Sequence, residues 1–324
     1  MMKRILFAGL CSALLLSPGC RMNANKEGVT PLMLAARSGD NATLSTLIAG
    51  GANLDKPSKY GWTALMFASW KGHTDIVQKL LQAGANPNVV SKDVPSAFET
   101  VGGHPPSAAL REAIQNQHFD IAYLLLDAGA TADPVACALA GGTGNIPLLE
   151  KLLTLGVDLN RSSRNGFYPT PLCAASEAGK LEAVQWLIKK GADPNFIAVH
   201  HTALGKAVYA DQVEIVEYLL KHGANPNLVY SFMKGAALHE AATKRSPWRK
   251  YDENLAIIRI LLSHGADRAH KANGKHTALE FVKIQRNNGL KYVQKVTDPK
   301  IRKRLEDSQK HKDSIIDLLT KWNC

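Results

Sequence analysis

The chain has few of the residues that build metal centres or disulfide frameworks. Among its 324 residues are five cysteines, and no two of them form a CxxC pair or a Cys/His cluster with metal-ligand spacing. The sequence HEAAT begins at His239 and places Thr243 where an HExxH zinc motif needs its second histidine. We therefore expect no metal site and no disulfide framework.

Motifs that carry enzyme chemistry are also missing. No GxSxG, Walker or GxGxxG sequence is present, and no acid, base and nucleophile form a recognisable set. His200 and His201 are adjacent, and adjacent side chains of an extended chain point apart, which argues against a shared metal. Cys137 and Cys173 fall at positions expected to pack inward as small core residues. The sequence predicts a protein that is not an enzyme and uses no cofactor.

The N-terminus has an apolar run that is too short to cross a bilayer. Residues 5–16 carry no charge and follow Lys3 and Arg4, which is the pattern of a signal peptide. Ser17 and Gly19 place small residues three and one positions before a cut after Gly19. We expect residues 1–19 to be a signal peptide, with Cys20 as the first residue of the exported protein.

A cysteine directly after the cut resembles the bacterial lipobox, in which leucine, a small residue and Gly or Ala precede the lipid-bearing cysteine. Leu16 stands one place further upstream than in that pattern, and Pro18 replaces the usual Ala or Ser. The resemblance implies a lipid on Cys20 that anchors the protein to a membrane. Because Arg21 stands where an Asp retains such lipoproteins at the inner membrane, we expect the outer membrane. A secreted protein without lipid and a buried N-terminal helix are the alternatives.

One pattern repeats along most of the chain. Leucines 32, 65, 172 and 204 each precede the glycine of a Gly-Ala pair by 19 residues, and weaker copies from Leu110 and Cys137 keep this spacing. A seventh copy has 27 residues between Leu238 and Gly265, so eight are additional, and an eighth begins at residue 276. A constant spacing with variable surface residues is typical of a repeated structural unit.

These copies resemble the ankyrin repeat. Residues 170–175 read TPLCAA, close to the Thr-Pro-Leu-His-x-Ala signature, and residues 191–195 read GADPN, the typical end of the unit. The resemblance spans residues 28–282 and implies an all-α ankyrin-repeat solenoid of about eight helix-turn-helix repeats with β-hairpin-like fingers. We expect residues 20–27 to be a short tether and residues 283–324 to hold a basic segment and a C-terminal capping helix.

The local chemistry of the second copy agrees with a helix pair. Thr63 is placed to cap the N-terminus of a first helix, and Gly72 to end it in a left-handed conformation. Asp75 favours the start of the second helix, which Gly84 ends. The apolar stripe of that helix comprises Ile76, Val77, Leu80 and Leu81.

Three segments depart from the repeat. A Pro- and Gly-rich insertion at 89–106 predicts a long finger loop, either a binding element or a tolerated surface insertion. Gly141, Gly142 and Gly144 weaken the first helix of the fourth copy and make it a candidate flexible point. Residues 283–312 hold ten Lys/Arg against three Asp/Glu, which suits a solvated cap of the last repeat or a contact with lipid phosphate.

The ankyrin resemblance implies binding of another protein through the concave face and the fingers. Large aromatic side chains at exposed positions are favoured anchors of protein interfaces. Aromatics in the fingers or near the concave face are therefore candidate partner-binding residues: Tyr60, Trp62, Trp70, Phe98, Phe167, Tyr168, Tyr230 and Phe232.

Together these features favour a non-catalytic protein-binding module of a Gram-negative envelope, located in the periplasm and anchored to the outer membrane. The layout is similar to exported ankyrin lipoproteins that block phospholipase effectors, which implies an immunity protein. An envelope scaffold that holds a periplasmic partner at the membrane is the alternative. No nucleic acid or small-molecule substrate is expected, although the net charge of +11 would suit nucleic acid if the N-terminus stayed uncut inside the cell.

Overall fold

The structure is a computed structural model that describes residues 28–92, 107–162, 168–198, 200–230, 235–243, 251–293 and 298–322. Across these ranges the chain forms α-helices and no β-strand, as the sequence predicts. The expected signal peptide, tether and lipidation site at Cys20 lie outside the described residues. So do three of the candidate anchors, Phe98, Phe167 and Phe232.

The helices of the described residues form eight consecutive pairs, which confirms the predicted number of repeats. The first helices of the pairs are α3 (Pro31–Ser38), α5 (Ala64–Lys71), α7 (Ala109–Gln115), α9 (Pro134–Thr143), α11 (Pro171–Glu177), α13 (Ala203–Tyr209), α15 (Ala237–Thr243) and α17 (Ala278–Val293). The second helices are α4 (Asn41–Ala49), α6 (Thr74–Gln82), α8 (Phe119–Asp127), α10 (Ile146–Thr154), α12 (Leu181–Lys189), α14 (Val213–Lys221), α16 (Tyr251–Ser263) and α18 (Pro299–Lys321).

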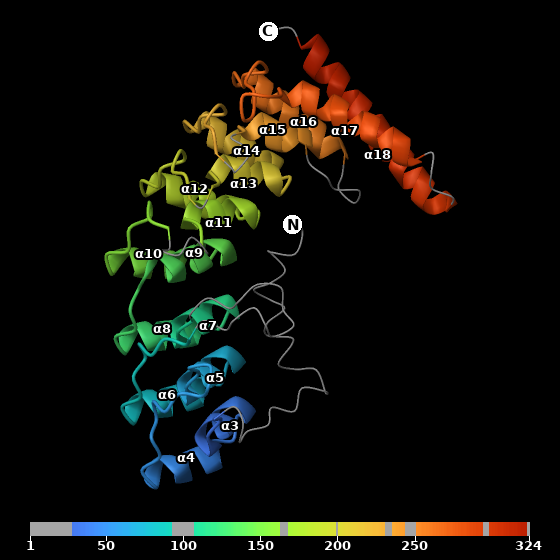
Figure 1. Cartoon of the computed structure of the whole chain (residues 1–324). Coiled ribbons are helices and arrows are strands. Elements are labelled where there is room, and N and C mark those ends of the chain that lie inside the picture. The colour runs from blue at the N-terminus through green and yellow to red at the C-terminus, as the bar shows by residue number, and fades with distance from the viewer. Residues whose placement is uncertain are drawn as a thin grey trace. The chain divides into compact units, whose positions relative to one another are not determined.

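The chain divides into two compact units, residues 1–139 and residues 140–324, with the boundary inside α9. In unit 1, the first helices α3, α5 and α7 pack side by side in one row, and α4, α6 and α8 form a second row (Figure 1). In unit 2, α11, α13, α15 and α17 form the row of first helices, beside a row made of α12, α14, α16 and α18. Each unit therefore presents one surface made of first helices.

Threonine side chains start five of the first helices. The Thr63 hydroxyl accepts a hydrogen bond from the Met66 N–H at 3.4 Å, which confirms the predicted cap of α5. Four other first helices, α3, α11, α13 and α17, begin with the same bond, made by Thr30, Thr170, Thr202 and Thr277. Gly72 ends α5 with a φ of 77°, a left-handed conformation that glycine adopts without steric cost.

The recurring leucines form the core between the helices. Leu65 and its counterparts at 32, 110, 172, 204 and 238 are at most 2% exposed, and burying a leucine side chain contributes about 1.5–3 kcal/mol. Cys137 and Cys173 are free thiols and fully buried, as predicted for small core residues. Burial raises the pKa of the Cys137 thiol to about 12 and that of Cys173 to about 11, so both are protonated and unreactive.

Asparagine side chains at the ends of the repeats join neighbouring repeats. The Asn195 Nδ2 donates to the Gly223 carbonyl at 2.9 Å, and its Oδ1 accepts the Asn225 N–H at 2.7 Å. The same two bonds to the following repeat are made by Asn88, Asn160 and Asn227. These bonds fix the distance and register between successive repeats.

The fingers between repeats are short hairpins, as predicted. In unit 2, isolated antiparallel bridges pair Ala198 with His201, Tyr230 with Gly235 and Ala272 with His276. In unit 1, the Ser58 N–H donates to the Trp62 carbonyl at 2.8 Å, which closes the finger before α5. These turns position the finger side chains along the edges of the first helices.

The last pair closes unit 2 with longer helices than the other repeats. Residue 282, where the repeats are expected to end, lies inside α17, so this helix continues into the basic segment. α18 packs along α17, and the Gln309 side chain lies against Gly289, where a Cβ atom would come within 2.2 Å of the Gln309 Nε2. Among the residues that the structure describes, no helix is both long and apolar enough to span a membrane.

Candidate protein-binding face

Three aromatic rings cluster on the first-helix surface of unit 1. The Trp62 ring, from the finger before α5, lies 4.9 Å from the Phe67 ring and 6.0 Å from the Trp70 ring, measured between centroids. Phe67 and Trp70 are only 3% and 5% exposed, whereas Trp62 is half-buried. Trp62 therefore covers the aromatic side chains of α5 and is itself the accessible part of the cluster.

A lysine side chain lies over this cluster. The Lys71 Nζ is 3.9 Å from the centroid of the Trp70 ring, a cation–π contact worth about 0.5–2 kcal/mol. Partial burial lowers the pKa of Lys71, and the nearby positive charge of Arg37 lowers it further. No carboxylate of the described residues forms an ion pair with Lys71. Its charge is held over an aromatic ring.

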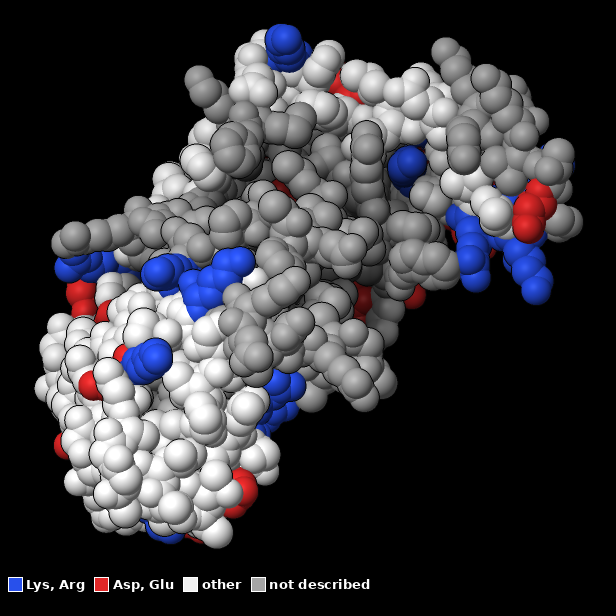
Figure 2. All heavy atoms as spheres, turned by 60° about the horizontal axis from the view of Figure 1, so that its bottom comes forward, with Lys and Arg blue, Asp and Glu red and all other residues white. Residues whose placement is uncertain are grey.

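The neighbouring residues extend this surface. Leu34 of α3 is 43% exposed and occupies the position in its helix that Phe67 occupies in α5. We call the group Leu34, Arg37, Trp62, Trp70 and Lys71 the unit 1 face. In Figure 2, which brings the lower end of Figure 1 forward, Lys and Arg side chains of unit 1 lie beside broad areas of uncharged residues. The unit 1 face combines a tryptophan and an arginine, residue types that protein interfaces favour, with a lysine and an exposed leucine.

Two of the predicted anchors are buried, and the expectation of exposed rings is wrong for both. Tyr230 is 4% exposed because its ring fills the space left by Gly205 of α13, where a Cβ atom would lie 2.4 Å from the Tyr230 Cζ. Trp70 is covered by Trp62 and Lys71. The remaining described candidates, Tyr60, Trp62 and Tyr168, are half-buried and keep accessible area.

The first-helix surface of unit 2 has an ion pair between two of its helices. The Lys206 Nζ of α13 lies 3.0 Å from a carboxylate oxygen of Glu177 of α11, and both side chains are about 15% exposed. Burial and the Lys206 charge lower the pKa of His201 to about 4, so this imidazole is neutral near pH 7. The Lys206 and Glu177 charges therefore neutralise one another, and His201 adds no charge near pH 7.

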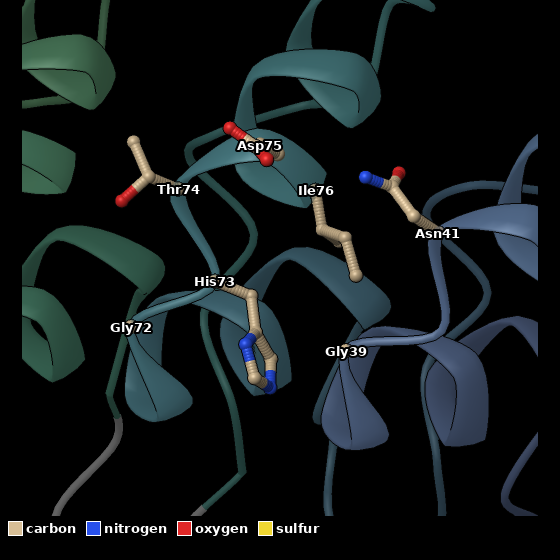
Figure 3. A pocket seen from close by; sticks show the side chains of 7 residues that line it. All are labelled: Gly39, Asn41, Gly72, His73, Thr74, Asp75 and Ile76. Atoms are coloured by element: carbon tan, nitrogen blue, oxygen red, sulfur yellow. The ribbon is translucent and has the colours of Figure 1, made fainter.

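A hollow of about 320 Å³ opens in unit 1 at the turns that join the helices of the first two repeats. Figure 3 shows the His73 imidazole between the Gly39 and Gly72 turns, and its Nε2 lies 3.2 Å from the Arg37 carbonyl oxygen. His118 of the next repeat lies against Gly72 in the same way. This hollow therefore belongs to the packing between repeats.

The described residues contain no group of three His, Cys, Asp or Glu side chains arranged to hold a metal ion. His239, at the place of the incomplete HExxH motif, is 5% exposed, and its Nε2 lies 3.4 Å from the His276 carbonyl oxygen. His201 belongs to a finger hairpin in which its N–H donates to the Ala198 carbonyl at 2.9 Å. His239 is therefore packed in the core, and His201 is held by main-chain hydrogen bonds of its hairpin.

Comparison with known proteins identifies the repeats. A family model described as ankyrin repeats (3 copies) matches residues 4–91 and 135–230, more than half of the chain. The chain belongs to the ankyrin-repeat family. Ankyrin repeats are protein-binding modules, so this chain carries a surface for another protein.

Solved ankyrin structures are similar to this chain. The human ASB11 ankyrin repeat domain is 22% identical, with 78% of this chain and 91% of that chain covered and a TM-score of 0.44. The ankyrin repeat domain of Bcl-3, described as a unique member of the IkappaB protein family, is 24% identical, with 79% and 94% covered and a TM-score of 0.44. No curated protein sequence matches the chain.

Sequence reasoning missed the cation of the unit 1 face. Lys71 directly follows Trp70, but neighbouring helix residues point about 100° apart, so adjacency alone does not predict a contact. A tryptophan and a lysine in the last turn of a short helix were the available signal. The sequence also gave no sign that Trp62 folds back along α5.

Proposed function

We propose that this ankyrin protein is an exported, non-catalytic binding protein of a Gram-negative envelope that binds a partner protein through the unit 1 face. The observation that carries the proposal is the Trp62 ring beside the Lys71 cation held over Trp70. Tryptophan is among the residue types that most often dominate the binding energy of an interface, and Trp62 is accessible. The half-buried Trp62 exposes area without needing to unpack the core.

The proposed location rests on the N-terminal sequence. A signal peptide at 1–19 and a lipid on Cys20 would place the repeats in the periplasm at the outer membrane, within reach of envelope proteins and of proteins delivered from other cells. In this setting we propose an immunity role, on the similarity of the layout to exported ankyrin lipoproteins that block phospholipase effectors. The repeats would bind a toxic phospholipase-type effector and block its active site.

The test is to replace Trp62 with alanine and measure binding to the protein that the wild-type chain captures from its native envelope. We expect Trp62→Ala to weaken binding at least tenfold, because truncation of an anchoring aromatic costs more than about 1.4 kcal/mol. Trp186→Ala is the matched control, since Trp186 also has a lysine, Lys190, 5.3 Å from its ring but lies on the second-helix surface. Equal affinity of both variants would contradict the proposed face.

The immunity role has its own measurement. If the captured protein is toxic in the periplasm, co-production of the wild-type chain should restore growth, and the Trp62→Ala chain should do so less well. A partner that is bound but harmless would exclude the immunity role and favour an envelope scaffold that holds this partner at the membrane.

A further inference from the structure

The first residues of α18 carry a cluster of positive charge. Four cations stand among its first six residues: Lys300, Arg302, Lys303 and Arg304. The first turn holds no acidic residue, and the Asp298 side chain before it is used as a cap that accepts two main-chain N–H groups. Cations at the start of a helix oppose its dipole. Helix stability therefore does not account for this cluster.

These residues extend past the end of α17. The two helices lie side by side (Figure 1), and two contacts give their register. Arg286 pairs with Asp313, and three residues further along α17, Gly289 meets Gln309, four residues earlier in α18. The helices are therefore antiparallel. With equal rise per residue in both helices, this register places residues 299–304 beyond the last residue of α17.

The extension exposes an isoleucine among its cations. All five residues from 300 to 304 are exposed, and Ile301 is 47% exposed. Ile301 lies on the apolar stripe of α18, which continues through Leu305 to the buried Leu319. In the last turn of α17, Leu290 is 37% exposed. The apolar stripe of α18 therefore continues past its cover and ends in solvent.

The lysines of the extension are accessible to an anion. Within the part of the chain that the structure describes, the side chains of Lys300 and Lys303 form no hydrogen bond and no ion pair. Lys310 is also exposed and lies on the same side of the helix, since steps of three and seven residues return to one face. Asp307 lies on this side too and offsets one of the three charges. A net positive strip remains on α18.

We propose that residues 299–304 of α18 dock on an anionic phospholipid membrane. Lys300 and Lys303 contact lipid phosphates, and Ile301 enters the boundary between headgroups and acyl chains. Basic and aliphatic side chains in one segment are typical of helices that bind at membrane interfaces. This contact goes beyond the proposed function. It would orient unit 2 on the membrane to which a lipid on Cys20 would tether the chain.

The chemistry of the extension favours lipid over other anionic partners. Single-stranded nucleic acid is bound with aromatic side chains that stack on bases, and residues 299–304 contain none. A protein partner is usually held by aromatic anchors at the centre of a packed surface, which this helix end also lacks. A second copy of the chain would bring the same cations together, and like charges repel.

The probe is a pair of vesicle preparations sedimented with the full chain that carries Cys20→Ser, so that no acyl group contributes. One preparation contains phosphatidylethanolamine and phosphatidylglycerol, and the other contains phosphatidylcholine alone. We expect binding to the anionic vesicles that weakens at least tenfold in Lys300→Glu/Lys303→Glu and falls as salt concentration rises. Ile301→Gln should weaken it by about threefold or more, because an apolar side chain no longer leaves water.

Lys180→Glu/Lys189→Glu is the matched control. It makes the same change in net charge at exposed lysines beside and within α12 and should keep most of the binding. Thermal unfolding separates lost binding from misfolding. Because acidic residues suit the start of a helix, Lys300→Glu/Lys303→Glu should unfold at the same temperature as the wild type or at a higher one.

Four results would overturn the proposal. They are equal binding of the wild-type chain to both vesicle preparations, equal losses in the two double variants, no loss in Ile301→Gln, and tighter binding of a DNA oligonucleotide than of anionic vesicles at the same lysines. The proposed function is tested separately, since Trp62→Ala should leave vesicle binding unchanged while it weakens binding of the partner protein.

Discussion

At the scale of single residues, the asparagines that end the repeats have a defined task. Each of Asn88, Asn160, Asn195 and Asn227 donates to a glycine carbonyl and accepts an N–H in the following repeat. An asparagine side chain carries a donor and an acceptor at a fixed separation, so it can bond a carbonyl and an N–H of the next repeat at the same time. Aspartate and serine lack this combination of geometry and reach.

The bonds of Asn195 can be tested by substitution. We expect Asn195→Ala to lower the free energy of unfolding by about 1–3 kcal/mol, because two hydrogen bonds are lost at about 0.5–1.5 kcal/mol each. Asn195→Asp should also destabilise, since it keeps the acceptor for the Asn225 N–H but sets an anionic oxygen against the Gly223 carbonyl. Urea unfolding measures both.

Asn288→Ala is the matched control for this experiment. Asn288 lies exposed within α17, where alanine favours helix formation, so its replacement should leave stability unchanged or slightly higher. A loss equal to that of Asn195→Ala would show that the inter-repeat bonds contribute nothing specific.

The residues of the candidate site were only partly predictable. The sequence indicated Trp62 as an aromatic at an accessible position, and the structure leaves it half-buried. The burial of Tyr230 was not predictable, because it depends on the missing side chain of Gly205, 25 positions earlier in the chain. This contact joins residues far apart in the sequence, so the residues around Tyr230 do not indicate it.

At the scale of elements, the two glycines of α9 lie inside the helix, and one of them is needed for its packing against α11. The sequence predicts that Gly141 and Gly142 weaken this helix, yet α9 runs from Pro134 to Thr143 and includes both. A Cβ atom on Gly141 would lie 2.5 Å from the Pro171 carbonyl oxygen at the start of α11. Gly141 is therefore needed for close packing of two helices, whereas Gly142 has only an ordinary contact, 3.8 Å to the Ala174 Cβ.

The two glycines should respond to alanine in opposite ways. Gly141→Ala is expected to lower the free energy of unfolding by about 1–3 kcal/mol, because the backbone of α11 must move to admit the methyl group. Gly142→Ala is expected to raise it by about 0.5–1 kcal/mol, since alanine favours the helix and meets no obstacle. Thermal unfolding of the two single variants provides the comparison, and effects of the same sign would contradict the packing argument.

Element boundaries were predicted well where the spacing is constant and poorly where it is not. The caps at Thr63 and Gly72 lie where the sequence placed them. In the seventh repeat, α16 has 13 residues and begins at Tyr251, whereas the second helices before it have nine. In this added turn, the Asn254 Nδ2 donates to the Ala241 carbonyl, and the Asn254 Oδ1 lies 2.9 Å from the His311 Nε2 of α18. These contacts join distant parts of the sequence, so the sequence pattern does not predict them.

At the scale of the whole molecule, repetition made the fold predictable and left the partner unspecified. The constant 19-residue spacing determines helix pairs, their stacking and the buried leucines, since these must be similar in every copy. The residues that distinguish one binding surface from another are those that vary between copies. The unit 1 face consists of such positions, so pattern alone could not assign its chemistry.

Export of the whole chain is a prediction about its N-terminus. We expect mass spectrometry of the protein from its native cells to show a chain that begins at Cys20 and carries the added mass of acyl groups, and Cys20→Ser to lack that mass. A chain beginning at Cys20 without acyl groups would indicate a secreted protein. A chain that keeps residues 1–19 would contradict export and with it the proposed envelope partner.

The asparagine bonds between repeats have a consequence for how such an array changes over time. The two bonds that all four asparagines share go to main-chain atoms of the next repeat, and only Asn88 adds a side-chain bond, accepted from the Thr131 hydroxyl. The joint therefore accepts any repeat that ends in the same turn. Whole repeats can therefore be duplicated, deleted or exchanged without redesigning the junction. The surface residues of the repeats can therefore change during evolution without loss of the bonds that join one repeat to the next.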